Sequence, residues 1–312
     1  MSYYSIIFTI ISLGTVLGGI FVPITTFSQA SDIAANTTAK YKSSTGAGSP
    51  LPNIASSPAR SDKFGIKEIY PTKQGGREWY INMSNPRNDN IFSIGTGFAH
   101  ENITKQPDGS WRIAYPKVRM SVDTPLNTPM WKNVEITGYV KINSIIPNDN
   151  NKVNYTDLAW FARGGTHTQT SPCEGLALIG GIHDDGSVGW KKEIWFTGGY
   201  TDELAQAKPT DSIVGRWIGW KVVMYNIINN SAVKMESYLD DKNNNHWVKV
   251  TDIIDDGGWY ANTPDNVFYS ANCGRAKDYI ITNPGPDVDF RSDNLVWDFK
   301  DLSIREIRPS IT

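Results

Sequence analysis

Short apolar segments separated by turn residues fill most of the chain from residue 64 to residue 309. The segments are rich in Val, Ile, Trp, Tyr and Phe, a pattern that is typical of β-strands. Strands are expected at residues 134–142, 158–163, 176–183, 192–196, 217–227, 233–239, 247–253 and 295–307. Only residues 201–208 (TDELAQAK) have a helical pattern. The chain is therefore predicted to be all-β, as a two-sheet antiparallel β-sandwich of the jelly-roll type.

Two different segments precede this domain. Residues 5–24 form an uncharged apolar run, and the small residues around Ala30 offer a cleavage site, which predicts a signal peptide over residues 1–30. The run is also long enough to span a bilayer, and no Lys or Arg precedes it, so a retained N-terminal membrane anchor is the alternative. Both interpretations place the domain outside the cell, either secreted or anchored at its N-terminus.

The next segment, residues 31–62, is rich in Ser, Thr, Ala, Gly and Pro. Such a composition cannot bury a core, so a disordered linker is expected here, followed by the sandwich domain over residues 63–312. The chain has two cysteines, Cys173 and Cys273, and an even number in an exported protein predicts one disulfide between them.

Charge and composition exclude some partners. The 312 residues carry a formal net charge of -2 and no basic cluster, which argues against nucleic acid as a partner. Aromatic residues reach 12%, with eleven Trp. Flat aromatic rings suit the binding of sugar rings, so the outward faces of the strands are candidate positions for a sugar site.

Alternation along three neighbouring strands separates a core face from a mixed polar and aromatic face. The core face is expected to hold Leu158, Trp160, Leu178, Ile182, Ile194 and Phe196. The opposite face is expected to carry Arg163, His183, Lys191, Glu193 and Trp195. His167 and Tyr200 lie in glycine-containing loops that follow two of these strands and could overhang the same face. This groove hypothesis requires Arg163 and His183 to share a face.

The second half of the domain resembles a known superfamily. The stretches GRWIGWKVVMYNI, NNSAVKMESYLDD and NNHWVKVTDIIDDGGW look like the back half of a concanavalin A-like lectin/glucanase jelly roll, and VWDFKDLSIREI looks like its closing strand. Secreted archaeal members of the superfamily are the most similar in character. Because the superfamily includes lectins, glycanases and polysaccharide lyases, the resemblance implies a fold and leaves the activity open.

The favoured function is extracellular carbohydrate binding, with a polysaccharide or cell-surface glycan as partner and a groove across a concave sheet face as the site. The candidate ligand-binding residues are Arg163, His167, His183, Lys191, Glu193, Trp195 and Tyr200. A polysaccharide lyase is one alternative, and a structural cell-envelope protein is another.

Whether the protein is an enzyme stays open at this point. The lyase alternative rests on a distant similarity to alginate-lyase-type enzymes, which implies catalytic roles for Arg163, His183 and Tyr200. Gly181 stands where those enzymes carry a glutamine. The paired carboxylates of glycosidases are not found on one strand, because Glu236 and Asp240 lack a second Glu beside them.

No cofactor is expected. The four histidines do not have metal-ligand spacing, and no HExxH, phosphate-binding or GxSxG motif occurs. Structural calcium is the one ion for which the chain offers candidates. They are the acidic turns at Asp184 and Asp185, at Asp240 and Asp241, and at Asp287 and Asp289. An ordinary turn role is the favoured explanation of these aspartates, because Asp is common in turns.

Overall fold

The computed structural model describes residues 60–95, 102–147, 157–165, 172–197, 199–261 and 272–309. The expected signal peptide, the expected linker up to residue 59, and His167 lie outside the described residues. Within the described part, no helix has the length and apolar character needed to cross a membrane.

Strands dominate the described residues, as the alternation predicts. The longer strands are β4 (Trp111–Asp123), β5 (Val134–Ile145), β6 (Asp157–Gly164), β7 (Leu176–His183), β8 (Val188–Ile194), β11 (Ile218–Ile227), β12 (Ala232–Asp240), β13 (Val248–Asp255) and β14 (Asp287–Glu306). The short strands are β1 (Glu78–Tyr80), β2 (Phe92–Ser93), β3 (Ile103–Lys105), β9 (Gly199–Tyr200) and β10 (Leu204–Ala207). The 3-10 turns are η1 (Pro86–Asn88), η2 (Pro172–Glu174), η3 (Trp195–Thr197) and η4 (Ile228–Asn230).

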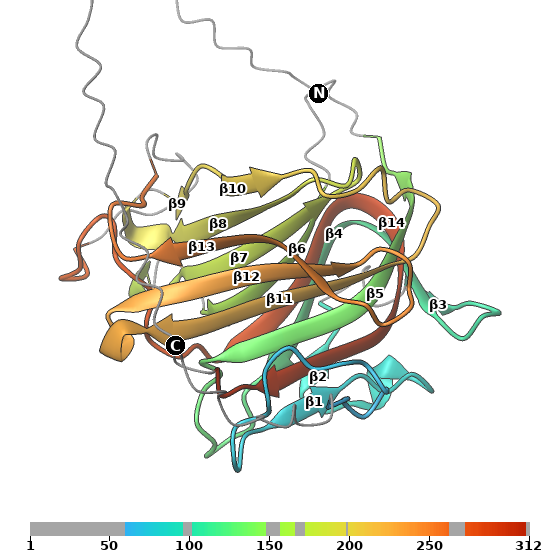
Figure 1. Ribbon diagram of the computed structural model, residues 1–312, viewed down its shortest axis with the longest axis horizontal. Coiled ribbons are helices and arrows are strands. Elements are labelled where there is room, and N and C mark those ends of the chain that lie inside the picture. Colours follow the sequence, from blue (N-terminus) through green and yellow to red (C-terminus); the bar gives the residue numbers. More distant parts are fainter. Residues whose placement is uncertain are drawn as a thin grey trace, which may run out of the picture. The chain divides into compact units, whose positions relative to one another are not determined.

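The strands form two antiparallel layers that share β14 (Figure 1). The layer here called the front layer has the order β10-β8-β7-β6-β14 and lies farther from the viewer in Figure 1. The layer here called the back layer has the order β14-β5-β11-β12-β13 and lies nearer the viewer. Residues 287–293 of β14 pair with β6, whereas residues 295–306 pair with β5. Asn294, between the two parts, has a φ of 57°, a region that Asn tolerates better than most residues. The predicted two-sheet sandwich is confirmed.

The core lies between the layers and is rich in tryptophan. Trp160 of β6 and Trp220 of β11 are fully buried, with ring centroids 4.2 Å apart. Gly138 of β5 makes room for them, because a Cβ on Gly138 would lie 3.3 Å from the Trp160 ring and 2.4 Å from Leu302. The six residues predicted for the core face of β6 to η3 are all buried. Alternation therefore assigned the inward face correctly.

A buried ion pair also joins the layers. Lys192 Nζ of β8 lies 2.9 Å from Asp255 Oδ2 of β13, and both side chains are fully buried. Lys192 also donates to the backbone carbonyl of Tyr279 at 3.0 Å and lies 5.2 Å from the ring of Trp259. Burial lowers the pKa of Lys192 and raises the pKa of Asp255, in both cases against the attraction between the two groups.

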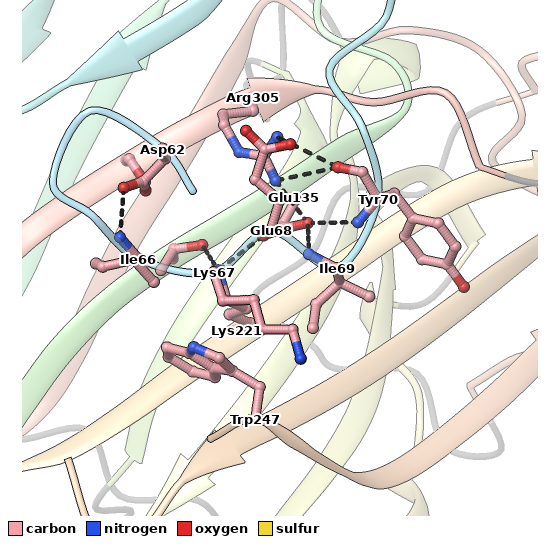
Figure 2. Close-up of polar contacts among 12 residues, drawn as sticks. Asp62, Ile66, Lys67, Glu68, Ile69, Tyr70, Glu135, Lys221, Trp247 and Arg305 are labelled. Carbon is pink, nitrogen blue, oxygen red and sulfur yellow. Dashed lines mark hydrogen bonds and ion pairs between the residues drawn. The ribbon is translucent and has the colours of Figure 1, made fainter. Parts of the chain in front are cut away.

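Residues 60–72, here called the N-terminal strap, cover the outer face of the back layer. Glu135 of β5 accepts from Lys221 Nζ at 2.7 Å and from Arg305 Nη2 at 2.8 Å. Its second oxygen also accepts from the backbone N–H groups of Ile69 and Tyr70 (Figure 2). All three charged side chains are buried, so the strap excludes water from this network.

Two further features complete the fold. A disulfide joins Cys173 of η2 to Cys273, as predicted. Residues 201–208 do not form the expected helix; instead they contain β10, which pairs with β8. The helical pattern was misleading because β10 is a short strand beside β8 with a register shift, where side chains need not alternate.

Candidate functional site

The outer face of the front layer gathers polar and aromatic side chains from strands β4, β6, β7, β8, β9 and β14. In this register, Asp293 of β14 lies opposite Asp157 of β6, which lies opposite His183 of β7. A cavity of about 350 Å³, here called the central cavity, opens on this face. Its lining residues are Arg119, Asp157, Ala159, Phe161, Ile179, Lys191, Tyr200, Thr201, Arg291 and Asp293.

Two arginines of the central cavity are held in place by carboxylates. Arg119 Nη2 contacts both oxygens of Asp293 at 3.0 Å. Arg291 donates to Asp289 Oδ2 from Nε at 3.0 Å and from Nη2 at 2.6 Å. The guanidinium of Arg291 also lies 4.0 Å from the centroid of the Phe161 ring. The cavity therefore presents oriented donors and acceptors whose charges largely cancel.

Arg291 and Asp293 lie two residues apart on β14, a spacing that suits one face of a strand, but they do not pair with each other. Instead, Arg291 pairs with Asp289 on its own strand, and Asp293 pairs with Arg119 of β4. Because β4 lies far away in sequence, only the tertiary structure brings these groups together.

Asp157 has an unusual environment. Burial raises the pKa of its carboxyl group to about 6, although the neighbouring His183 lowers it. Nearby Asp293 and Glu203 add further repulsion between like charges. Burial thus moves the pKa of Asp157 toward neutrality, at a position that lines the central cavity.

Glu203, which precedes β10, connects His183 and Lys191. Its Oε1 lies 3.1 Å from His183 Nε2, and its Oε2 lies 3.8 Å from Lys191 Nζ. Burial opposes ionisation of Glu203, but the hydrogen bond to His183 and the charge of Lys191 outweigh burial and lower its pKa. Burial lowers the pKa of Lys191.

A second cavity of about 490 Å³ lies on the other side of Glu203. Its lining residues are His183, Asp184, Asp185, Ser187, Val188, Glu203, Gln206, Ala207 and Lys208. His183 and Glu203 line this second cavity, whereas Lys191 lines the central cavity. The contacts of Glu203 with His183 and Lys191 therefore lie at the border of the two cavities.

The expected position of Arg163 is wrong. The pairing of β6 with β14 shifts register between residues 162 and 164, so Arg163 is the extra residue of a β-bulge, with a φ of 62°. Its side chain donates to the carbonyls of Lys132 and Ile281 at 3.1 and 2.6 Å. Burial lowers the pKa of the guanidinium to about 9.

The bulge has a direct consequence for the groove expected from the sequence. Arg163 points toward the segments that precede β5, away from the face that carries Phe161 and His183. Arg163 and His183 do not share a face, so the groove that required both of them is not formed. The cavity described above uses other cations, namely Arg119 and Arg291.

Of the other predicted site residues within the described part, three line one of the two cavities and two do not. Lys191 and Tyr200 line the central cavity, and His183 lines the second cavity. Glu193 is buried in β8, opposite Tyr200 of β9. Trp195 was expected to continue this face, but β8 ends at Ile194 and Trp195 lies in η3, outside the lining of either described cavity.

Three of the six aspartates considered for calcium pair with cationic side chains. Asp185 pairs with Lys208, Asp241 pairs with Arg216, and Asp289 pairs with Arg291. Over the described ranges, no three His, Cys, Asp or Glu side chains are grouped so that they could hold a metal ion.

Sequence reasoning missed several residues of the site. Arg119 could have been found, because alternation in β4 places Val118, Met120 and Val122 inward and Arg119 outward. Glu203 could not, because its segment has a helical pattern. Glu236 and Asp240, considered above as a catalytic pair, lie on β12 of the back layer. Tyr70 of the N-terminal strap donates to Glu236, and Tyr139 of β5 donates to Asp240.

The chain matches no protein-family model. It also matches no curated protein. Similar solved structures include a Bacillus subtilis protein of unknown function with a galectin-like fold, at a TM-score of 0.41 and 11% identity over 75% of this chain and 100% of that chain. The exoplasmic/lumenal domain of VIP36 in its Ca²⁺/Man-bound form has a TM-score of 0.41 and 10% identity over 74% of this chain and 89% of that chain. Basic winged bean lectin with Tn-antigen has a TM-score of 0.42 and 7% identity over 73% of this chain and 97% of that chain.

Proposed function

We propose that the protein binds a neutral carbohydrate in the central cavity of the front layer. The observation that carries the proposal is the set of charge-paired donors and acceptors around an aromatic wall. Arg119 with Asp293 offers N–H donors beside carboxylate acceptors, and Arg291, held by the buried Asp289, offers further N–H donors. Sugar hydroxyl groups both donate and accept, so vicinal hydroxyls suit such pairs.

The balance of charge favours a neutral sugar over a uronate. Each arginine of the cavity has a carboxylate partner, and Lys191 lies 3.8 Å from Glu203. An anionic ligand would have to compete with these carboxylates at short range, which costs free energy in a partly buried site. Tyr200, 39% exposed, supplies the accessible ring against which a pyranose can pack.

The same balance weakens the case for a polysaccharide lyase. A lyase needs a cation that neutralises the uronate carboxylate. Arg163, for which the resemblance implies a catalytic role, is buried away from the face. His183 and Tyr200 remain near the cavities, but the cations beside them already face carboxylates.

A glycan array followed by calorimetry tests the proposal. We expect neutral glycans to bind and uronate-containing glycans to bind more weakly. Arg119→Ala should weaken binding by about tenfold or more, the scale of a hydrogen bond to a charged group. Lys117→Ala is the matched control, because Lys117 is an exposed cation on the same strand that does not line the cavity. Equal losses in both variants, or binding of uronates alone, would contradict the proposal.

We also propose that the glycan is met outside the cell. The Cys173–Cys273 disulfide supports this location, because such bonds persist in oxidising compartments. Expression with and without residues 1–30, followed by fractionation, tests it. Retention of the full-length chain inside the cell would contradict export.

A further inference from the structure

A row of very small residues crosses three strands of the front layer. Ala159 of β6 lies opposite Gly181 of β7, and Gly181 lies opposite Gly189 of β8. Because none of these residues has a side chain beyond Cβ, the row forms a furrow in the sheet face. Ala159, at one end of the furrow, lines the central cavity.

The other end of the furrow is filled by Glu203. A Cβ on Gly189 would lie 2.2 Å from Glu203 Oε1 and 2.7 Å from its Cδ and Cγ. The carboxylate therefore lies directly on the backbone of Gly189, in space that any other residue type would occupy. Over Gly181 the same oxygen lies at 3.6 Å from the Cβ position, which is ordinary van der Waals contact.

Three side chains hold Glu203 in this position. His183 contacts Oε1 at 3.1 Å, whereas Lys191 and Gln206 approach Oε2 at 3.8 and 3.4 Å. Glu203 is attached through a connecting segment between β9 and β10 rather than through the sheet itself. Rotation of this one side chain would open the furrow without moving a strand of the front layer.

We infer that Glu203 is a plug that limits the length of the bound saccharide. This inference rests on the proposed function. With Glu203 in place, the central cavity accepts a short neutral sugar. With the carboxylate displaced, further sugar units of the same neutral chain lie along the furrow and reach the second cavity. There they meet hydroxyl, amide and imidazole groups of Ser187, Gln206 and His183. Seven of the nine residues that line the second cavity are polar or charged, so a hydroxyl-rich chain meets hydrogen-bonding partners there.

Glu203→Ala separates this inference from the proposed function. The probes are neutral monosaccharides and tetrasaccharides of gluco, manno and galacto configuration, measured by calorimetry against the full chain. We expect the ratio of tetrasaccharide to monosaccharide affinity to rise about five- to tenfold in the variant, the scale of one or two net hydrogen bonds. If the protein binds sugar but Glu203→Ala changes the affinities for monosaccharides and tetrasaccharides equally, the plug is overturned and the proposed function stands. No binding of any sugar by any form would overturn the proposed function and the plug together.

Two alanine substitutions provide a matched pair that needs no ligand. Gly189→Ala should expel the carboxylate and break its bond to His183, whereas Gly181→Ala should leave the bond intact. The imidazole nitrogen shifts of His183, measured by NMR, report the bond in both variants. Gly189→Ala should not gain affinity for tetrasaccharides, because its methyl group takes the vacated space. Retention of the bond in Gly189→Ala would overturn the placement of the plug.

Discussion

Asp157, which lines the central cavity, lies directly opposite His183, which lines the second cavity, on the neighbouring strands β6 and β7. Antiparallel partners of this kind have Cβ atoms about 4.5–5.5 Å apart, so the two groups sense each other's charge. Burial nevertheless dominates and raises the pKa of Asp157 to about 6 from its ordinary value near 3.8.

This shift predicts the sign of a pH effect on stability. Between about pH 4 and pH 6 the folded state binds more protons at Asp157 than the unfolded state does. The contribution of Asp157 is therefore most favourable below about pH 4 and is lost as the pH rises through 6, by about 3 kcal/mol at most. Asp157→Asn should remove this dependence and raise the free energy of unfolding at neutral pH relative to wild type.

Chemical denaturation at pH 4 and pH 7.5 measures the effect as the difference between variant and wild type. Asp185→Asn is the matched control. The hydrogen bonds from Ser187 lower the pKa of Asp185 to about 2, so its contribution has the opposite sign. A difference for Asp157→Asn that does not change with pH would contradict the assignment.

Tyr200 should matter more for sugar binding than Trp195. Tyr200 lines the central cavity, whereas Trp195 lies in η3 beyond the end of β8. Tyr200→Ala should weaken binding of a neutral glycan by about 1 kcal/mol, or roughly fivefold, through loss of the ring contact. Tyr200→Phe should retain most of the affinity, and Trp195→Ala should leave it unchanged. A larger loss of affinity for Trp195→Ala than for Tyr200→Ala in the same titration would contradict sugar binding in the central cavity.

Removing one partner of the buried pair of Lys192 and Asp255 should destabilise the fold strongly. Lys192→Met leaves a buried carboxylate without its cation, which costs about 3–5 kcal/mol of unfolding free energy. The double variant Lys192→Met/Asp255→Leu should recover much of this loss, since apolar residues of similar volume replace such pairs well. Lys208→Met, which breaks the exposed pair with Asp185, should cost less than about 1 kcal/mol. Similar denaturation midpoints for Lys192→Met and Lys208→Met would refute the difference expected between the buried and the exposed ion pair.

The N-terminal strap should depend on Glu135. Glu135→Gln removes the charge that lies between Lys221 and Arg305 and leaves two buried cations with reduced compensation. We expect a loss of about 3–5 kcal/mol and faster tryptic cleavage after Lys67 in the strap. Glu78→Gln, at an exposed position, serves as the control. Unchanged protection of Lys67 from trypsin would show that backbone contacts alone hold the strap.

The sequence by itself determined the all-β class, most strands, the disulfide and the inward face of β6 to β8. These features follow from local alternation and from the chemistry of two cysteines, and alternation holds wherever a strand is regular. Leu158, Trp160 and Leu178 illustrate it, because each lies in the core where the pattern places it.

Only the tertiary structure decided which polar groups meet at the site. One extra residue in β6 turned Arg163 away, and no local pattern marks where a ladder will shift. Arg119 and Arg291 come from strands far apart in sequence, and Glu203 reaches the furrow from a segment with a helical pattern. The site depends on register between distant strands, which is a property of the packed sheet rather than of any one segment.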